Sequence, residues 1–139
     1  MARRSYVLTV RAEADLWEAR TWSRVRWGVE LTSRYFQDLH DGAEYIAANH
    51  GSLRNRHDLA GGTSLHVHPV REHYIVYEPL TEGFIAIVAV IRQGRDLPAI
   101  LQKWAAPVRQ ELLQIRGRIK GGEIRAPGRR RVPMPRRKK

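Results

Sequence analysis

The sequence of 139 residues contains no cysteine, so neither a disulfide framework nor a cysteine-based metal site is available to it. No apolar run approaches the ~18 to 20 residues that a membrane helix needs. The start, Met1 to Ser5, is polar and leads into a strand-like segment instead of a long apolar signal core. We therefore expect one small domain in the reducing cytoplasm, with no membrane partner.

Negative charge is nearly missing from the C-terminal end of the chain. Residues 1–115 hold 14 basic and 13 acidic side chains, whereas residues 116–139 hold 11 basic side chains and Glu123 alone. The formal net charge of +11 is thus +1 from the body and +10 from the end. This split excludes a histone-like nucleic-acid binder, because the folded body has little net charge with which to neutralise phosphates. The body must act through local sites.

The first part of the body predicts one strand and two helices. Residues 6–10 are β-branched and aromatic, which is typical of a short strand. Apolar or small residues then recur every three or four positions from Ala12 to Ser23, and Gly28 ends this helix. A second stripe of the same period covers residues 31–46, so the two helices form an antiparallel hairpin. The space between them is expected to be filled by Trp17, Trp22 and Trp27.

The middle of the chain predicts a surface loop over residues 50–63, which has no hydrophobic period, and then three strands. The strands cover residues 64–68, 72–77 and 84–91, and short turns between them favour antiparallel pairing. The last is apolar on both faces. We therefore expect it in the centre of the sheet, with the first strand of the chain as a neighbour.

The C-terminal part predicts a helix that begins after an N-cap at Asp96 and is broken or restarted at Pro107. We expect a complete domain over residues 1–106 and a further helical segment over 107–120. Residues 121–139 have too few apolar groups to offset the entropy of ordering, so we expect a basic disordered end. Deleting it should leave the fold intact.

The predicted class is α+β: an N-terminal strand, an antiparallel helical hairpin, a three-stranded antiparallel meander that joins the first strand, and a C-terminal helix. Within this order, residues 5–104 carry a family pattern. It consists of Ala12-x-x-Asp15-Leu16, Trp22, Trp27-Gly28, Tyr35, Leu39, His73-x-Ile75-x-Tyr77, and Val90-Ile91 with Gln93-Gly94-Arg95-Asp96-Leu97-Pro98. On these residues the chain resembles the ParE branch of the RelE/ParE toxin superfamily, a RelE/ParE toxin-like fold.

This resemblance implies a toxin held inactive by an antitoxin encoded beside it. RelE-like members cleave mRNA on the ribosome, whereas ParE-like members bind DNA gyrase and stabilise its cleaved-DNA state. Cleavage by a 2′-hydroxyl needs a proton acceptor, a proton donor and cations around the phosphate, which RNA-cleaving relatives supply largely with Lys and Arg on the second and third strands. Here the second strand carries Ser64, His66 and His68 and neither Lys nor Arg, and Tyr74 stands where those nucleases have an arginine.

The resemblance to ParE is therefore the stronger one, although Arg92 stands where ParE-like chains commonly have a histidine. We predict a toxin without enzymatic activity that binds DNA gyrase and is neutralised by a cognate antitoxin in the groove between hairpin and sheet. The predicted target-binding residues are Arg92, Arg95, Asp96 and Trp104. The alternative is a ribosome-dependent mRNA endonuclease, whose catalytic residues would be Arg71, His73, Arg92 and Arg95. A third interpretation is a degenerate member that retains only antitoxin binding.

The strand histidines and the Gly61-Gly62 pair are the candidates for a metal site and for a phosphate-binding loop. His66 and His68 share one face of a strand and His73 lies on the next, but no carboxylate or cysteine completes a ligand set. Gly61-Gly62 lacks the Lys-Ser/Thr of a phosphate-binding loop and precedes a strand. We expect neither a metal nor a cofactor.

The basic end contains two clusters, Arg129 to Arg131 and Arg136 to Lys139. Three interpretations are open: a solubilising end, non-specific electrostatic contact with nucleic acid, and capture of an acidic antitoxin segment. Without aromatic residues the end offers no stacking platform, so contact with nucleic acid would be indifferent to sequence and sensitive to salt.

Overall fold

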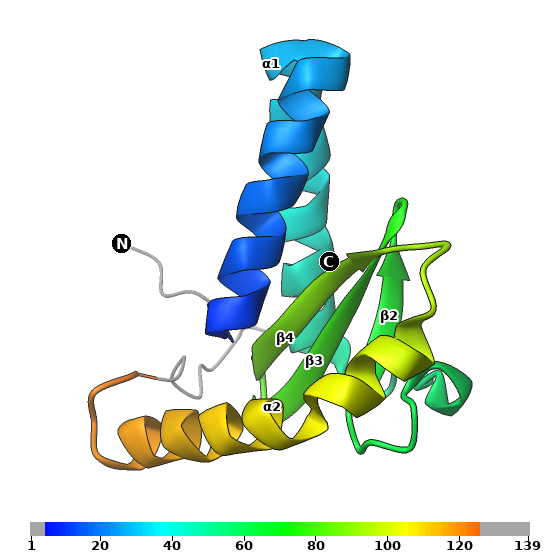
Figure 1. Cartoon of the computed structure of the whole chain (residues 1–139). Coiled ribbons are helices and arrows are strands. Elements are labelled where there is room, and N and C mark those ends of the chain that lie inside the picture. Colours follow the sequence, from blue (N-terminus) through cyan, green and yellow to red (C-terminus); the bar gives the residue numbers. More distant parts are fainter. Residues whose placement is uncertain (1–4, 126–139) are drawn as a thin grey trace.

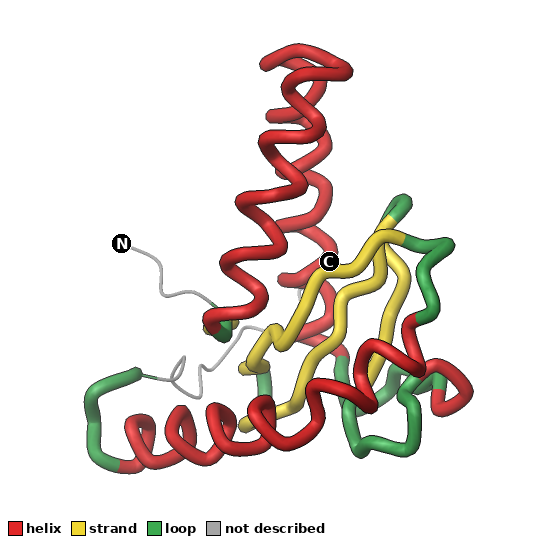
Figure 2. Tube along the Cα trace, viewed as in Figure 1, coloured by secondary structure: helices red, strands yellow, loops and turns green. Residues whose placement is uncertain are grey.

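The computed structural model describes residues 5–125 of the chain. In chain order the elements are β1 (Tyr6–Leu8), α1 (Val10–Asn49), the short 3₁₀ turn η1 (His57–Leu59), β2 (His66–Val70), β3 (His73–Thr81), β4 (Phe84–Arg92) and α2 (Leu97–Lys120). One sheet has the strand order β1-β4-β3-β2, with β1 parallel to β4 and the other pairs antiparallel (Figures 1 and 2). The predicted α+β class and the pairing of the first strand with the last are confirmed.

The helical hairpin is built within α1. Thr9 caps the first turn, since its side chain accepts a hydrogen bond from the Ala12 amide at 3.1 Å. Gly28 has φ +89° and ψ 172°, a conformation that interrupts the helix and reverses the chain. The two arms, residues 10–27 and 29–49, lie side by side, and their tip projects beyond the sheet (Figure 1).

The expectation that three tryptophans fill the space between the arms is wrong. Trp17 is 73% exposed, and Trp22 and Trp27 are exposed by 38% and 37%. The small side chains of Ser23 and Thr32 are buried along the arms instead. Such side chains let the two helices approach closely, which leaves the large indole rings outside.

The sheet separates two hydrophobic clusters. One face packs on α1 and the other on α2 and η1, as the layers in Figure 2 show. Every residue of β4 except Arg92 is buried, which confirms that this strand is central. A register shift opposite Val76 and Tyr77 leaves Val88 as an extra residue, so both Val88 and Ala89 belong to the cluster under α2.

Past the end of the short strand β1, side chains at the start of α1 and at its N-cap form hydrogen bonds with the backbone of β4. The Thr9 hydroxyl donates to the Val88 carbonyl at 2.8 Å, and Asp15 accepts a hydrogen bond from the Val90 amide at 3.0 Å. Burial raises the pKa of Asp15, while the Val90 hydrogen bond and Arg11 lower it. Asp15 thus fixes the first arm against the central strand.

The boundaries of β2 and β3 differ from those predicted. β2 begins at His66 and includes Pro69, and the turn lies at Arg71 and Glu72, with Arg71 at φ +56°. A proline is tolerated there because β2 is the edge strand and needs one ladder of hydrogen bonds only. The loop 50–63 is a surface segment as expected, and it contains η1.

The predicted break at Pro107 is wrong, because α2 is one helix from Leu97 to Lys120. The segment 107–120 is therefore a continuation of this helix and not a separate one. Val108, Leu112 and Ile115, beyond the proline, are buried in the same cluster as Leu101 before it. Packing on both sides holds the helix together against a local penalty of about 3 kcal/mol. Most of the predicted basic end, residues 126–139, lies outside the described residues.

Neither helix is long and apolar enough to cross a membrane, among the residues that the structure describes.

Candidate functional site

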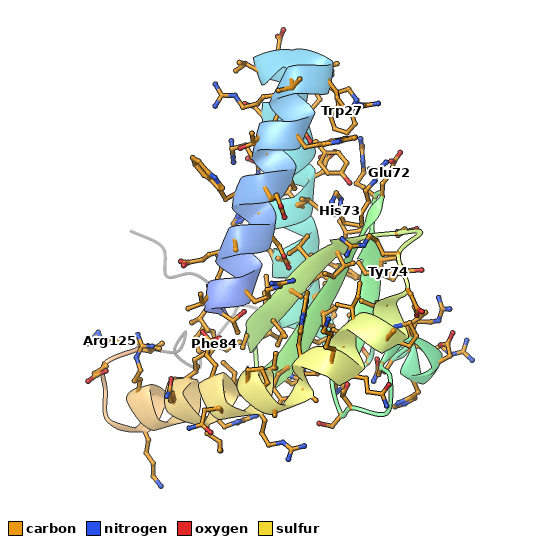
Figure 3. All side chains as sticks on the ribbon, in the orientation of Figure 1. Trp27, Glu72, His73, Tyr74, Phe84 and Arg125 are labelled. Carbon is orange, nitrogen blue, oxygen red and sulfur yellow. The ribbon has the colours of Figure 1, made fainter. Side chains whose placement is uncertain are left out.

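Cationic and aromatic side chains gather where the hairpin passes the ends of β3 and β4. Figure 3 shows Trp27 and His73 on the same side of the molecule, along the hairpin. We refer to the group as the arginine–aromatic cluster. Its members are Trp22, Arg26, Trp27, Tyr35, Arg71, His73 and Arg92.

The rings of the cluster form a continuous row. Trp22 meets Trp27 edge-on with 5.7 Å between ring centroids, and Trp27 lies 5.5 Å from Tyr35. Tyr35 in turn lies 5.6 Å from the ring of His73. These separations are within the range of favourable aromatic contacts, so the row links both arms of α1 to β3.

Hydrogen bonds fix the buried end of the row. The Tyr35 hydroxyl accepts a hydrogen bond from the Glu72 amide at 3.1 Å and lies 2.6 Å from Nδ1 of His73. Burial raises the pKa of Tyr35, and burial followed by the charge of Arg92 lowers the pKa of His73. We therefore assign the hydroxyl hydrogen to the bond with Nδ1 of a neutral His73.

The cations of the cluster lie over the rings. The guanidinium groups of Arg26 and Arg92 are each 4.6 Å from the ring centroid of Trp22. Arg71 lies 5.0 Å from that of Tyr35 and also forms an ion pair with Asp38 at 3.0 Å. Because β3 pairs His73 with Arg92, the sheet register places Arg92 beside the histidine. The result is an exposed surface rich in arginine above a neutral, hydrogen-bonded base.

A second group lies between the start of α1 and α2. The guanidinium of Arg11 is 3.4 Å from the ring centroid of Trp104 and 3.5 Å from the carboxylate of Asp15. Arg95 lies in the turn between β4 and α2, one residue before Asp96, and its charge is the smallest of the influences that lower the pKa of Asp15. Asp96 accepts a hydrogen bond from the Ala99 amide at 3.3 Å and caps α2.

The structure divides both predicted sets of residues between these two groups. Of the predicted target-binding residues, Arg92 belongs to the cluster, whereas Arg95, Asp96 and Trp104 belong to the region around the start of α2. Of the alternative nuclease set, Arg71, His73 and Arg92 belong to the cluster, whereas Arg95 lies in the turn before α2. Within residues 5–125, no three His, Asp or Glu side chains gather in a group that could hold a metal ion.

Sequence reasoning missed Arg26 and Arg11. Arg26 follows Trp22 by four residues, a spacing that places both on one helix face, and this signal was present in the sequence. Arg11 contacts Trp104 across 93 positions of the chain, and only the docking of α2 brings the two together. Trp22 was interpreted as a core residue because an aromatic within an apolar period is usually buried.

A groove of about 440 Å³ lies between the two arms of α1 and the strands β1 and β4, and it includes the exposed ring of Trp17. Arg20 lies over the ring of Phe36 within it, 4.5 Å from the ring centroid. The groove is therefore mostly apolar and carries charge of both signs, from Arg20 and Glu13.

Fold and surface together define a class of small α+β proteins in which a helical hairpin packs on a four-stranded sheet and exposes arginine and tryptophan beside it. The family model of the ParE toxin of the type II toxin-antitoxin system parDE matches residues 6–97. The chain belongs to this family, and the predicted membership is confirmed.

The chain is also similar to one curated protein and, in fold, to one solved structure. The chain is 29% identical to Toxin ParE of Escherichia coli over 93 residues, which are 67% of this chain and 88% of the relative. A solved chain of the chromosomal ParDE TA system from P. aeruginosa superposes with a TM-score of 0.53 at 16% identity, covering 66% of this chain and 96% of that one. Family membership makes this protein a toxin of a type II toxin–antitoxin system, with a cognate antitoxin as its partner.

Proposed function

We propose that this toxin arrests growth by binding DNA gyrase in the cytoplasm, as a binding protein and not as an enzyme. The target surface in this proposal runs from the arginine–aromatic cluster to the start of α2. Arg92 and Arg95 provide exposed cations, Asp96 caps α2, and Trp104 holds Arg11 in place.

The state of His73 is the observation that carries the proposal. RNA cleavage needs a side chain that accepts a proton and one that returns it, with cations around the phosphate. The Tyr35 hydroxyl occupies Nδ1 of His73, and burial and Arg92 lower its pKa, so His73 is a poor proton donor for a leaving group at neutral pH. Arg95, the remaining member of the nuclease set, lies in the turn before α2. These features favour binding over catalysis.

The groove between the arms of α1 and the strands β1 and β4 is the proposed site for the antitoxin. Its exposed Trp17 and partly buried Phe36 provide apolar contact, and Arg20 provides a cation for an acidic residue of the partner. A segment that folds as it binds gains affinity from burying such a surface.

The proposal is tested by incubating purified toxin with DNA gyrase and supercoiled DNA, and in parallel with ribosomes programmed with mRNA. We expect cleaved DNA to accumulate in the first reaction and the mRNA to remain intact in the second. Codon-positioned mRNA cuts with gyrase unaffected would instead establish the endonuclease alternative.

A matched pair of variants tests the surface. Arg95→Gln should reduce the accumulation of cleaved DNA, whereas Arg109→Gln, an exposed arginine of α2 that removes the same charge, should not. Equal behaviour of the two variants would show that the start of α2 is not the contact surface. Antitoxin binding by both variants serves as the control for folding.

A further inference from the structure

Arg26 and Arg92 are exposed cations without a carboxylate partner. Within residues 5–125, neither forms an ion pair or a side-chain hydrogen bond, in contrast to Arg71, which is tied to Asp38. Both instead lie over the ring of Trp22, which is itself 38% exposed. A cation that is not neutralised by the protein remains available to an anionic partner.

Contact with the Trp22 ring also positions these cations. A guanidinium over a ring keeps the N–H donors at its edge free, and that planar fork matches the oxygens of a phosphate. Since both groups are 4.6 Å from the same ring centroid, they are at most about 9 Å apart and can act together on one strand of a polyanion.

The surroundings add charge of the same sign. Residues 20–34, which form the tip of the hairpin, contain Arg20, Arg24, Arg26 and Arg34 and one acidic residue, Glu30. The tip projects beyond the sheet, so it is free to approach an extended partner (Figure 1). The near-neutral body of the protein therefore concentrates positive charge at this one end.

We propose that the face made by Trp22, Arg26, Trp27 and Arg92 binds the phosphate backbone of duplex DNA. The choice of DNA rests on the proposed function, because gyrase presents the toxin with a bound duplex. Arginine supplies the phosphate contacts, Trp22 holds the guanidinium groups in place, and Trp27 packs edge-on against Trp22. No base-reading side chain is required, so binding is indifferent to sequence and falls with salt.

The test measures the affinity of the full-length toxin for a short labelled DNA duplex by fluorescence anisotropy at several salt concentrations, without gyrase. The slope of log affinity against log salt is negative. Replacing both cations, Arg26→Gln with Arg92→Gln, should make this slope less steep by about two, since each lost phosphate contact removes about 0.9 from its magnitude. The matched control is Arg54→Gln with Arg109→Gln, which removes two exposed arginines outside the cluster.

An unchanged slope in the cluster variant, or an equal decrease in both variants, would overturn the proposal, the second because net charge alone would explain it. Loss of antitoxin binding with DNA affinity unchanged would assign the face to a protein partner. Tighter binding of a duplex RNA of the same sequence would overturn the assignment to DNA. Since gyrase is absent from this experiment, a negative result would overturn DNA binding by this face without overturning gyrase binding. A negative gyrase experiment would likewise leave the measured DNA binding unchanged.

A second pair of substitutions covers the case in which the glutamine variants do not fold. Arg26→Lys with Arg92→Lys keeps both charges and removes the planar guanidinium groups from the ring of Trp22. The salt slope should then stay near that of the natural protein, while the affinity falls by about two- to fivefold. Unchanged affinity would show that this contact with the ring has no role in binding.

Discussion

Tyr35 connects the two parts of the arginine–aromatic cluster. Its ring contacts Trp27 and His73, and its hydroxyl bonds to His73 and to the Glu72 amide. One side chain thus ties the second arm of α1 to the start of β3. The position of Arg92 depends on this arrangement, because Arg92 pairs with His73 across the sheet.

The neutral state of His73 has a consequence for the pH dependence of stability. Its pKa in the folded protein is lowered below the ordinary value of 6.5, first by burial and then by Arg92, with Glu72 opposing. As pH falls below 6.5, the unfolded chain takes up the proton before the folded one does. The contribution of His73 is thus present above 6.5 and is lost as pH falls toward the folded pKa.

We expect His73→Gln to lower the free energy of unfolding and also to weaken its dependence on pH. Urea denaturation at about pH 7.5 and about pH 5.5 measures both effects, and the difference between the two pH values is the diagnostic one. His57→Gln, at an exposed position outside the sheet, is the control. An undiminished pH dependence in the His73 variant would contradict a neutral His73.

At the scale of elements, the hairpin depends on one backbone conformation. Gly28 combines φ +89° with ψ 172°, a region that residues with a side chain rarely adopt. A Cβ at Gly28 would meet no atom within 4 Å, so the restriction comes from the backbone and not from crowding. The reversal brings Trp27 back toward Tyr35 on the second arm.

Gly28→Ala should therefore cost about 1 to 3 kcal/mol of stability. Gly117→Ala is the matched control, because that glycine lies within α2 and a Cβ there also meets nothing within 4 Å. Alanine in a helix interior is favoured over glycine by roughly 0.5 to 1 kcal/mol, so this change should stabilise the protein. Chemical denaturation of the two variants should give shifts of opposite sign.

At the scale of the whole molecule, the second half of α2 is part of the core. The family model ends at residue 97, yet Val108, Leu112 and Ile115 are buried against the sheet. Arg116 also forms an ion pair with Glu78 of β3 at 2.7 Å. The sequence predicted a domain over residues 1–106. The packed core also includes the second half of α2, up to Ile115.

Two adjacent leucines test this packing. Leu112 is 8% exposed and Leu113 is 62% exposed. Leu112→Ala should lower the free energy of unfolding by about 2 to 5 kcal/mol, because it leaves a cavity in the core. Leu113→Ala should change it by less than about 0.5 kcal/mol. Equal and small effects in urea denaturation would show that the second half of α2 is dispensable for the fold.

Local periodicity was sufficient for the helical hairpin and for the central strand. The stripe from Ala12 to Ser23, the stop at Gly28 and the apolar run of β4 are properties of neighbouring residues, and each is present in the structure. The continuity of α2 was not predictable in this way. Whether a helix continues through Pro107 depends on the sheet packed against both halves, which no local pattern contains.

The sequence by itself determined the α+β class, the order of the elements and the family, because these follow from periodicity, turn residues and motif spacing. Only the tertiary structure decided which arginines act together. Arg26 and Arg92 both lie over the ring of Trp22, and Arg11 lies over that of Trp104, because the hairpin and α2 dock on the sheet. Contacts between residues distant in the chain depend on how the elements pack, and a local sequence pattern does not determine that packing.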